Sequence, residues 1–250
     1  MSASRLAVAL GTSLLAAVGA ARAQTPGADP NEAAPFGSPV EDQRIFWHAL
    51  LDQLEGRFGD GESFRWDGQA WVGTDTDRLW LKSEGIVTSG QVEDGIHEAL
   101  YSRAVTTYFD VQAGLRYDLD SAPSRGWVAL GIQGLAPQFF DVEATGYASD
   151  AGHFAARLRT SYDLLLTQRL ILQPEIELNF YSKADPGRGI GTGLSDLDTG
   201  LRLRYEITRK FAPYIGVAYE DKFGQTADFA RRDGESVDSL RFVAGLRVWY

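Results

Sequence analysis

Few side chains in this sequence could carry out metal or catalytic chemistry. The chain has three histidines, His48, His97 and His153, no cysteine, and Met1 as its only methionine. These counts exclude disulfides, cysteine-based zinc or iron–sulfur sites, and methionine-rich tracts for soft metals. Any metal site must therefore use imidazole and carboxylate groups, of which the 34 acidic residues offer many.

Catalytic motifs are missing from the sequence, so we expect no enzyme and no catalytic residues. No G-x-S-x-G, H-E-x-x-H, P-loop or dinucleotide fingerprint stands in the right context. The segment from Gly189 to Gly193 is rich in glycine, but it lies between predicted strands and no helix follows it. It is therefore interpreted as a loop and not as a phosphate cradle.

Charged residues recur at every second position in four successive segments, and the sign of the charge alternates from one segment to the next. Charges that face each other on paired strands interact, and Arg binds carboxylates in a bidentate manner. We predict ion-pair ladders that fill a narrow interior, with a permeation or ion-binding path as the alternative. The residues are Asp141 and Glu143, then Arg157 and Arg159, then Glu175 and Glu177, then Arg202 and Arg204.

The elements that must position these charges are β-strands. From Phe46 to Tyr250 apolar and polar residues alternate with a period of two, as in the segment 154–166. Many of the predicted strands reach about 10 to 15 residues, which is longer than the strands of most soluble proteins. We predict an all-β fold, a transmembrane antiparallel up-and-down β-barrel of about 12 strands. A soluble lipocalin-like barrel is the alternative, with its apolar face turned inward.

Connection lengths support the barrel and fix the number of strands. Short and long connections alternate strictly, the long ones at 85–94, 118–124, 149–152, 184–193 and 224–236. Outer-membrane barrels have short periplasmic turns and longer external loops. The pattern gives eleven strands from Phe64 onward. Residues 44–57 could form a short helix, but the parity of the connections favours a twelfth strand there, which places both ends of the barrel in the periplasm.

Aromatic residues gather near the predicted strand ends, where we expect them to form the girdles of a membrane barrel. The residues are Trp47, Trp66, Trp71, Trp80, Trp127, Phe139, Phe140, Tyr214, Tyr219, Trp249 and Tyr250. The last strand ends on Tyr250. A terminal aromatic residue looks like the signal that the outer-membrane assembly machinery reads, so we expect this machinery and membrane lipid as partners.

The N-terminus has the features of an export signal. Residues 1–23 combine a basic start, an apolar core and an Ala-x-Ala site, so we expect a signal peptide that is cleaved after Ala23. Residues 24–43 are rich in Pro, Gly and acids and are predicted to be a flexible periplasmic linker before a barrel at 44–250. The net charge of −10 argues against nucleic acid as a partner.

Eight stretches of the sequence together carry a resemblance to a known family. They are LDQLE (51–55), RWDGQAW (65–71), RLWLKSEG (78–85), YSR (101–103), GIQGLAP (131–137), LLLTQRLILQPEIELN (164–179), GLRLRYE (200–206) and FAPYIGV (211–217). These stretches resemble the copper resistance protein B family of Gram-negative outer membranes. The resemblance covers about residues 44 to 250. It implies an outer-membrane barrel that serves copper tolerance and periplasmic copper handling.

The sequence departs from this family in its N-terminal arm. Many members carry a Met- and His-rich segment ahead of the barrel, whereas residues 24–43 contain neither residue. Imidazole and carboxylate ligands suit Cu(II) better than Cu(I), so we expect Cu(II) as the ion. The resemblance and the ligand types together give a candidate site at His48, Asp52, Glu55 and His97, with His153 as a further candidate.

Three functions remain open from the sequence. The first is a copper-homeostasis barrel that binds or passes copper ions. The second is a structural barrel that docks a periplasmic copper oxidase or carrier through residues 24–43 and has no copper site of its own. The third is a barrel-embedded hydrolase, for which the three histidines lack an obvious serine-containing motif.

Overall fold

The computed structural model describes residues 44–59, 61–119 and 124–250, which form one closed antiparallel β-barrel. The predicted signal peptide and linker, residues 1–43, lie outside the described residues. The strands are β1 Phe46–Phe58, β2 Ser63–Gly73, β3 Asp77–Thr88, β4 Gln91–Ala104, β5 Phe109–Asp118, β6 Arg125–Ala136, β7 Phe140–Ser149, β8 Phe154–Ser161, β9 Leu164–Leu165, β10 Leu170–Tyr181, β11 Gly193–Tyr205, β12 Phe211–Lys222 and β13 Asp238–Trp249.

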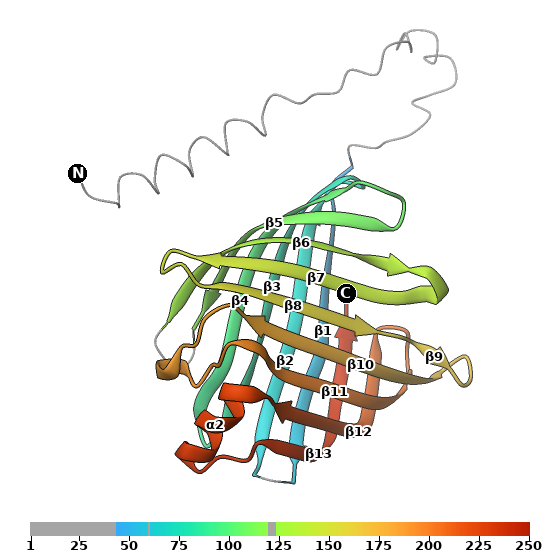
Figure 1. Cartoon of the computed structure of the whole chain (residues 1–250). Coiled ribbons are helices and arrows are strands. Elements are labelled where there is room, and N and C mark those ends of the chain that lie inside the picture. Colours follow the sequence, from blue (N-terminus) through green and yellow to red (C-terminus); the bar gives the residue numbers. More distant parts are fainter. Residues whose placement is uncertain (1–43, 60, 120–123) are drawn as a thin grey trace, which may run out of the picture. The chain divides into compact units, whose positions relative to one another are not determined.

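The thirteen strand segments make twelve barrel strands, as the sequence predicts. β8 and β9 both pair with β10 in one continuous register, with Ser161 opposite Glu175 and Leu164 opposite Leu172. Between them the amide of Tyr162 donates to the carbonyl of Pro174 at 3.1 Å. They are two parts of one strand. The barrel closes because β1 pairs with β2 on one side and β13 on the other (Figure 1).

The barrel wall is polar inside and apolar outside. Along β6, Trp127 and Ala129 are buried in the lumen, whereas Val128, Leu130 and Ile132 are 60%, 62% and 44% exposed on the outer face. The buried side chains of the described residues include more polar and charged groups than apolar ones. An apolar outer band around a polar interior is typical of a membrane barrel and is the reverse of a soluble one.

The first strand begins and the last strand ends at the same end of the barrel, which we call the terminal end. There Leu50 of β1 is opposite Trp249 of β13, and Tyr250 exchanges two backbone hydrogen bonds with Ala49 at 2.8 and 3.0 Å. The terminal end carries the short connections 74–76, 105–108, 137–139, 166–169 and 206–210. The opposite end, called the distal end, carries the two longest connections, 182–192 and 223–237.

The strand at residues 44–57 is confirmed as β1, and a β-bulge explains why its alternation was unclear. The pairing register of β1 shifts around Asp52 against both neighbouring strands. Against β2 the shift falls between Leu51 and Gln53 of β1, and against β13 it falls between Leu51 and Leu54 of β1. A bulge adds one residue to one strand and breaks the period of two there. The short helix considered for this segment is therefore wrong.

The long connection expected at 85–94 is wrong. β3 and β4 continue to Thr88 and Gln91 and are joined by a tight turn at Ser89 and Gly90, which have φ of +52° and +81°. Consecutive residues with positive φ form hairpin turns whose twist matches that of the strands. The polar residues Glu93 and Asp94 lie in this extension, where the strand no longer alternates, so the sequence indicated a loop.

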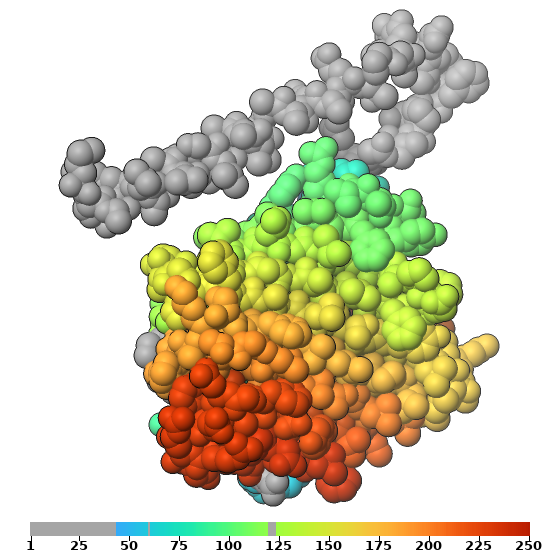
Figure 2. All heavy atoms as spheres, in the orientation of Figure 1, coloured from blue at the N-terminus to red at the C-terminus, as the bar shows by residue number. Residues whose placement is uncertain are grey.

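The connection at 223–237 contains a helix that the sequence pattern did not reveal, α2 Gly224–Asp233. Thr226 ties it to β11 and to the β10–β11 connection, since its hydroxyl lies 3.0 Å from Ser195 Oγ and accepts from the Gly191 amide at 2.9 Å. Figures 1 and 2 show α2 beside the β10–β11 connection at the distal end. The β10–β11 connection contains a 3-10 turn, η3 Pro186–Arg188, and η2 Pro137–Phe139 joins β6 to β7.

The helices among the described residues are too short or too polar to cross a membrane.

Placing a charge on the outer face tests whether that face contacts hydrocarbon. We expect Leu130→Arg, in the middle of β6, to lower the free energy of unfolding in lipid by about 2–4 kcal/mol, because an arginine at the bilayer midplane is poorly solvated. The measurement is urea unfolding of the barrel folded in phospholipid vesicles, followed by tryptophan fluorescence. Phe139→Arg, at the terminal end, is the control and should cost about 0–1 kcal/mol. Equal costs at the two positions would contradict a membrane-spanning outer face.

Candidate functional site

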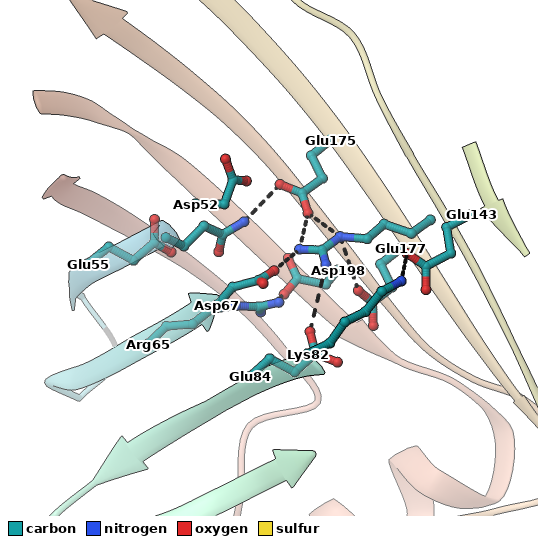
Figure 3. Close-up of polar contacts among 12 residues, drawn as sticks. Asp52, Glu55, Arg65, Asp67, Lys82, Glu84, Glu143, Glu175, Glu177 and Asp198 are labelled. Atoms are coloured by element: carbon teal, nitrogen blue, oxygen red, sulfur yellow. Dashed lines mark hydrogen bonds and ion pairs between the residues drawn. The ribbon is translucent and has the colours of Figure 1, made fainter. Parts of the chain in front are cut away.

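The lumen holds a dense network of guanidinium–carboxylate pairs in the middle of the barrel. We call this network the central belt. Figure 3 shows carboxylates of the belt and its neighbours pointing toward one another from several strands. The belt consists of Glu55 and Arg57 on β1, Asp67 on β2, Glu84 on β3, Arg157 and Arg159 on β8, Glu175 and Glu177 on β10, and Arg202 on β11.

Six of the eight residues that were predicted to form ion-pair ladders make ion pairs with residues on neighbouring strands. Arg159 Nε lies 2.7 Å from Glu175 Oε1 and 3.7 Å from Glu177 Oε2. Arg202 Nη1 lies 2.9 Å from the other oxygen of Glu175. Arg157 Nη2 is 3.9 Å from Glu143 Oε1. Strands β7, β8, β10 and β11 are adjacent, so the side chains reach one another along the wall.

The remaining two ladder residues lie nearer the terminal end. Arg204 donates to Asp163 at 2.7 Å and to Gln173 at 3.1 Å. Asp141 lies opposite Ser161 in the register of β7 and β8 and lines a cavity. Lys82 of β3, which the sequence pattern did not single out, reaches Glu143 at 2.8 Å from the other side of the lumen.

The belt also crosses the lumen, which the sequence pattern did not indicate. Arg159 of β8 donates to Asp67 of β2, and Arg157 of β8 donates to Glu84 of β3. Figure 3 shows Asp67, Glu84 and Glu175 around the same space. These partners are far apart in sequence and lie on strands that are not neighbours. Only closure of the barrel brings them within contact distance.

Glu55 is the most deeply buried carboxylate of the belt, with no exposed surface. It accepts hydrogen bonds from Arg57 Nε at 3.0 Å, from Arg202 Nε at 2.9 Å and from the Tyr214 hydroxyl at 3.0 Å. These donors come from β1, β11 and β12. A buried carboxylate with several charged donors is stable in its ionised form, so Glu55 fixes the positions of the strands around it.

Two cavities flank the belt inside the lumen. The terminal cavity has a volume of about 280 Å³ and the distal cavity about 450 Å³. Acidic residues outnumber basic ones on both walls. The terminal cavity is lined by Asp52, Asp67, Glu84, Glu98, Asp141, Glu143 and Asp163 against Lys82, Arg157, Arg159 and Arg247. The distal cavity is lined by Glu84, Glu93, Asp94, Glu177, Asp196, Asp198, Glu220, Asp221, Asp233 and Glu235 against Arg65, Arg116, Arg188 and Lys222.

His48, Asp52 and Glu55 all lie on β1, but the structure does not bring them together. The His48 ring lies between two indoles, 5.6 Å from Trp249 and 6.2 Å from Trp71. Asp52 accepts from Arg247 at 2.5 Å, and the bulge at Asp52 separates it from the regular strand that carries Glu55. His48 is therefore at the terminal mouth of the lumen and Glu55 is in the central belt.

His97 lies on a different surface. It is opposite Ser83 in the register of β3 and β4 and alternates with the buried residues Glu98 and Leu100, so it faces outward. His153 lies in the connection before β8. Within residues 44–59, 61–119 and 124–250, no group of three or more His, Asp or Glu side chains is arranged to hold a metal ion. The four-residue copper site stays a prediction.

Three of the aromatic residues expected in the girdles lie inside the lumen, so the prediction is wrong for them. Trp80 and Trp127 are 8% and 4% exposed, and Tyr214 is 5% exposed. Trp127 packs edge-on against Tyr147 and donates to Asp118 at 2.8 Å. Trp80 is a member of the same buried cluster as Trp127. A barrel of this width fills part of its lumen with large side chains, and sequence alone does not separate the two faces where both carry aromatics.

Comparison with known proteins identifies similar sequences and similar folds. The family model described as copper resistance protein B precursor matches residues 45–250. Copper resistance protein B of Escherichia coli is 46% identical over 230 residues, which are 90% of this chain and 78% of that protein. The copper resistance protein B homolog of Pseudomonas syringae pv. tomato is 50% identical over 215 residues, 86% of this chain and 73% of that protein.

Among solved structures, the NanC porin is similar in fold. It superposes with a TM-score of 0.52 at 12% sequence identity and covers 81% of this chain and 99% of its own. At this identity the likeness concerns the barrel fold alone.

Removing the carboxylate of Glu55 tests the structural role of the belt. We expect Glu55→Ala to lower the free energy of unfolding by about 3–5 kcal/mol, because Arg57 and Arg202 lose their buried partner. The measurement is urea unfolding in phospholipid vesicles. The matched control is Asp228→Ala, which breaks an exposed pair with Arg231 on α2 and should change stability by about 0.5 kcal/mol or less. A small effect at Glu55 would show that the belt does not hold the barrel together.

Proposed function

The chain belongs to the copper resistance protein B family, and from this premise we propose that it is an outer-membrane barrel that binds or passes copper ions through its lumen. The observation that carries the proposal is the excess of carboxylates on the walls of both lumen cavities. A cavity lined mainly by one sign of charge, with walls of low dielectric, concentrates ions of the opposite sign. Copper ions are the cations that the family name points to.

The donor groups of this lumen favour Cu(II) over Cu(I). The chain has no cysteine and no methionine besides Met1, so it offers no soft sulfur ligands inside the barrel. Carboxylate oxygens and imidazole nitrogens are the ligands that Cu(II) accepts. We propose that copper in transit meets carboxylates in both cavities and the imidazole of His48 at the terminal mouth.

The orientation of the barrel follows from its connections. Outer-membrane barrels place short turns in the periplasm and longer loops outside the cell. We propose that the terminal end faces the periplasm, with the signal peptide removed after Ala23 and residues 24–43 acting as a periplasmic linker. His48 would then stand at the periplasmic mouth, and α2 would lie on the external side.

The alternative is a docking barrel without a copper site of its own. The arginines of the central belt already pair with its carboxylates, which leaves fewer of them available to an ion. In this case a periplasmic copper oxidase or carrier would bind at the terminal end and residues 24–43. The two functions differ in whether the purified barrel retains copper.

Copper loading of single histidine variants tests the proposal. The barrel in detergent is loaded with Cu(II), or with Cu(I) under reductant, then desalted and measured by mass spectrometry. We expect wild type to retain Cu(II) and His48→Ala to retain less, with His97→Ala unchanged because its side chain faces outward. Cu(II) bound at His48 should also quench tryptophan fluorescence, since the indoles of Trp71 and Trp249 lie 6.2 and 5.6 Å away.

The same experiment separates the two functions. If neither oxidation state is retained by wild type, copper binding by the barrel is wrong and the docking function gains support. A pull-down from periplasmic extract, with and without residues 24–43, then shows whether a partner depends on the linker. If copper is retained equally by all variants, the lumen binds copper but His48 is not a ligand.

A further inference from the structure

The two lumen cavities meet at a thin partition. Of the residues that line them, Glu84 and Ile96 line both cavities. Glu84 is a member of the central belt, and its carboxylate pairs with Arg157 and lies 3.7 Å from Arg159. The guanidinium groups of Arg157 and Arg159 therefore lie beside a side chain that both cavities share.

Arg159 makes the widest set of contacts at this partition. Its guanidinium lies against four carboxylates from three strands: Asp67 on β2, Glu84 on β3, and Glu175 and Glu177 on β10. Asp67 and Glu175 both accept hydrogen bonds from it, the latter at 2.7 Å. Arg159 therefore bridges opposite sides of the lumen with a single positive charge.

Position distinguishes Arg159 from the other arginines of the belt. Its side chain is 20% exposed, whereas those of Arg157 and Arg202 are 4% exposed and that of Arg57 is fully buried. Arg159 lines the terminal cavity, and its partner Glu177 lines the distal one. The guanidinium has space on the terminal side into which it could move without leaving the lumen.

We propose, on the basis of the function proposed above, that Arg159 is the gate of the lumen and sets its selectivity for cations. In the closed form its charge repels cations, and its two hydrogen bonds and two longer ion pairs hold four carboxylates across the path. When the guanidinium moves into the terminal cavity, these carboxylates face the path and form a continuous acidic route between the cavities. Rings of acidic side chains make pores selective for cations, and a fixed arginine opposes them.

Ion conductance of purified protein in planar lipid bilayers tests this proposal without copper. Wild type and Arg159→Gln are compared in a KCl gradient, and conductance and reversal potential are recorded. We expect about a tenfold higher conductance in Arg159→Gln, with the reversal potential displaced toward that of K⁺, because the substitution removes the positive charge that lies among four carboxylates and leaves an acidic constriction. Arg247→Gln is the matched control, since Arg247 lines the terminal cavity away from the partition and pairs with Asp52.

The outcomes are distinct. The proposal is overturned if Arg159→Gln conducts no more than wild type, if it becomes selective for anions, or if Arg247→Gln opens the lumen equally.

Circular dichroism and heat-dependent gel mobility verify that each variant folds. If Arg159→Gln does not fold, the double variant Arg159→Gln with Glu177→Gln takes its place, because it removes the positive charge together with one of the carboxylates that this charge neutralises. Conductance above wild type in this variant supports the gate, and wild-type conductance overturns it.

The outcome of the conductance experiment does not depend on whether the barrel binds copper. K⁺ conductance controlled by Arg159 with no retained copper would leave the gate in place and overturn copper binding by the barrel. Retained copper with a lumen insensitive to Arg159 would do the reverse.

Discussion

The structure depends on neutralising charges that a closed barrel encloses. The strands present acidic and basic side chains to a narrow lumen, where an unpaired charge is costly because little water solvates it. Glu55 illustrates the solution: it has no exposed surface and is held by Arg57, Arg202 and Tyr214. Since these donors come from β1, β11 and β12, the pairing that satisfies the carboxylate also fixes how the sheet closes.

The same network divides the lumen. The central belt occupies the middle of the barrel, and the remaining volume forms a cavity of about 280 Å³ at the terminal end and one of about 450 Å³ at the distal end. Both cavities are acidic, whereas the belt places several guanidinium groups between them. Acidic cavities of this kind attract cations, which is the physical basis of the function proposed for the lumen.

Three elements show where the sequence pattern was ambiguous or did not predict the structure. In β1 the bulge at Asp52 breaks the alternation that identifies a strand, and the number of connections was needed to recognise it. In β3 and β4 the strands extend to a tight turn at Ser89 and Gly90, in a region where polar residues had indicated a loop. The helix α2 is short, and its contacts through Thr226 form only in the folded barrel.

Local features of the sequence predict the architecture: alternation along the strands, the parity of the connections and the motifs shared with the family indicate a twelve-strand barrel related to copper resistance protein B. These signals are local or nearly local, because side chains of a strand alternate with a period of two. Which charged side chains pair with one another depends on the folded barrel. Arg159 is 92 residues from Asp67, and Arg202 is 147 residues from Glu55. Such pairs form across the lumen only when β1 and β13 join, and a linear sequence carries no register for strands that are not neighbours.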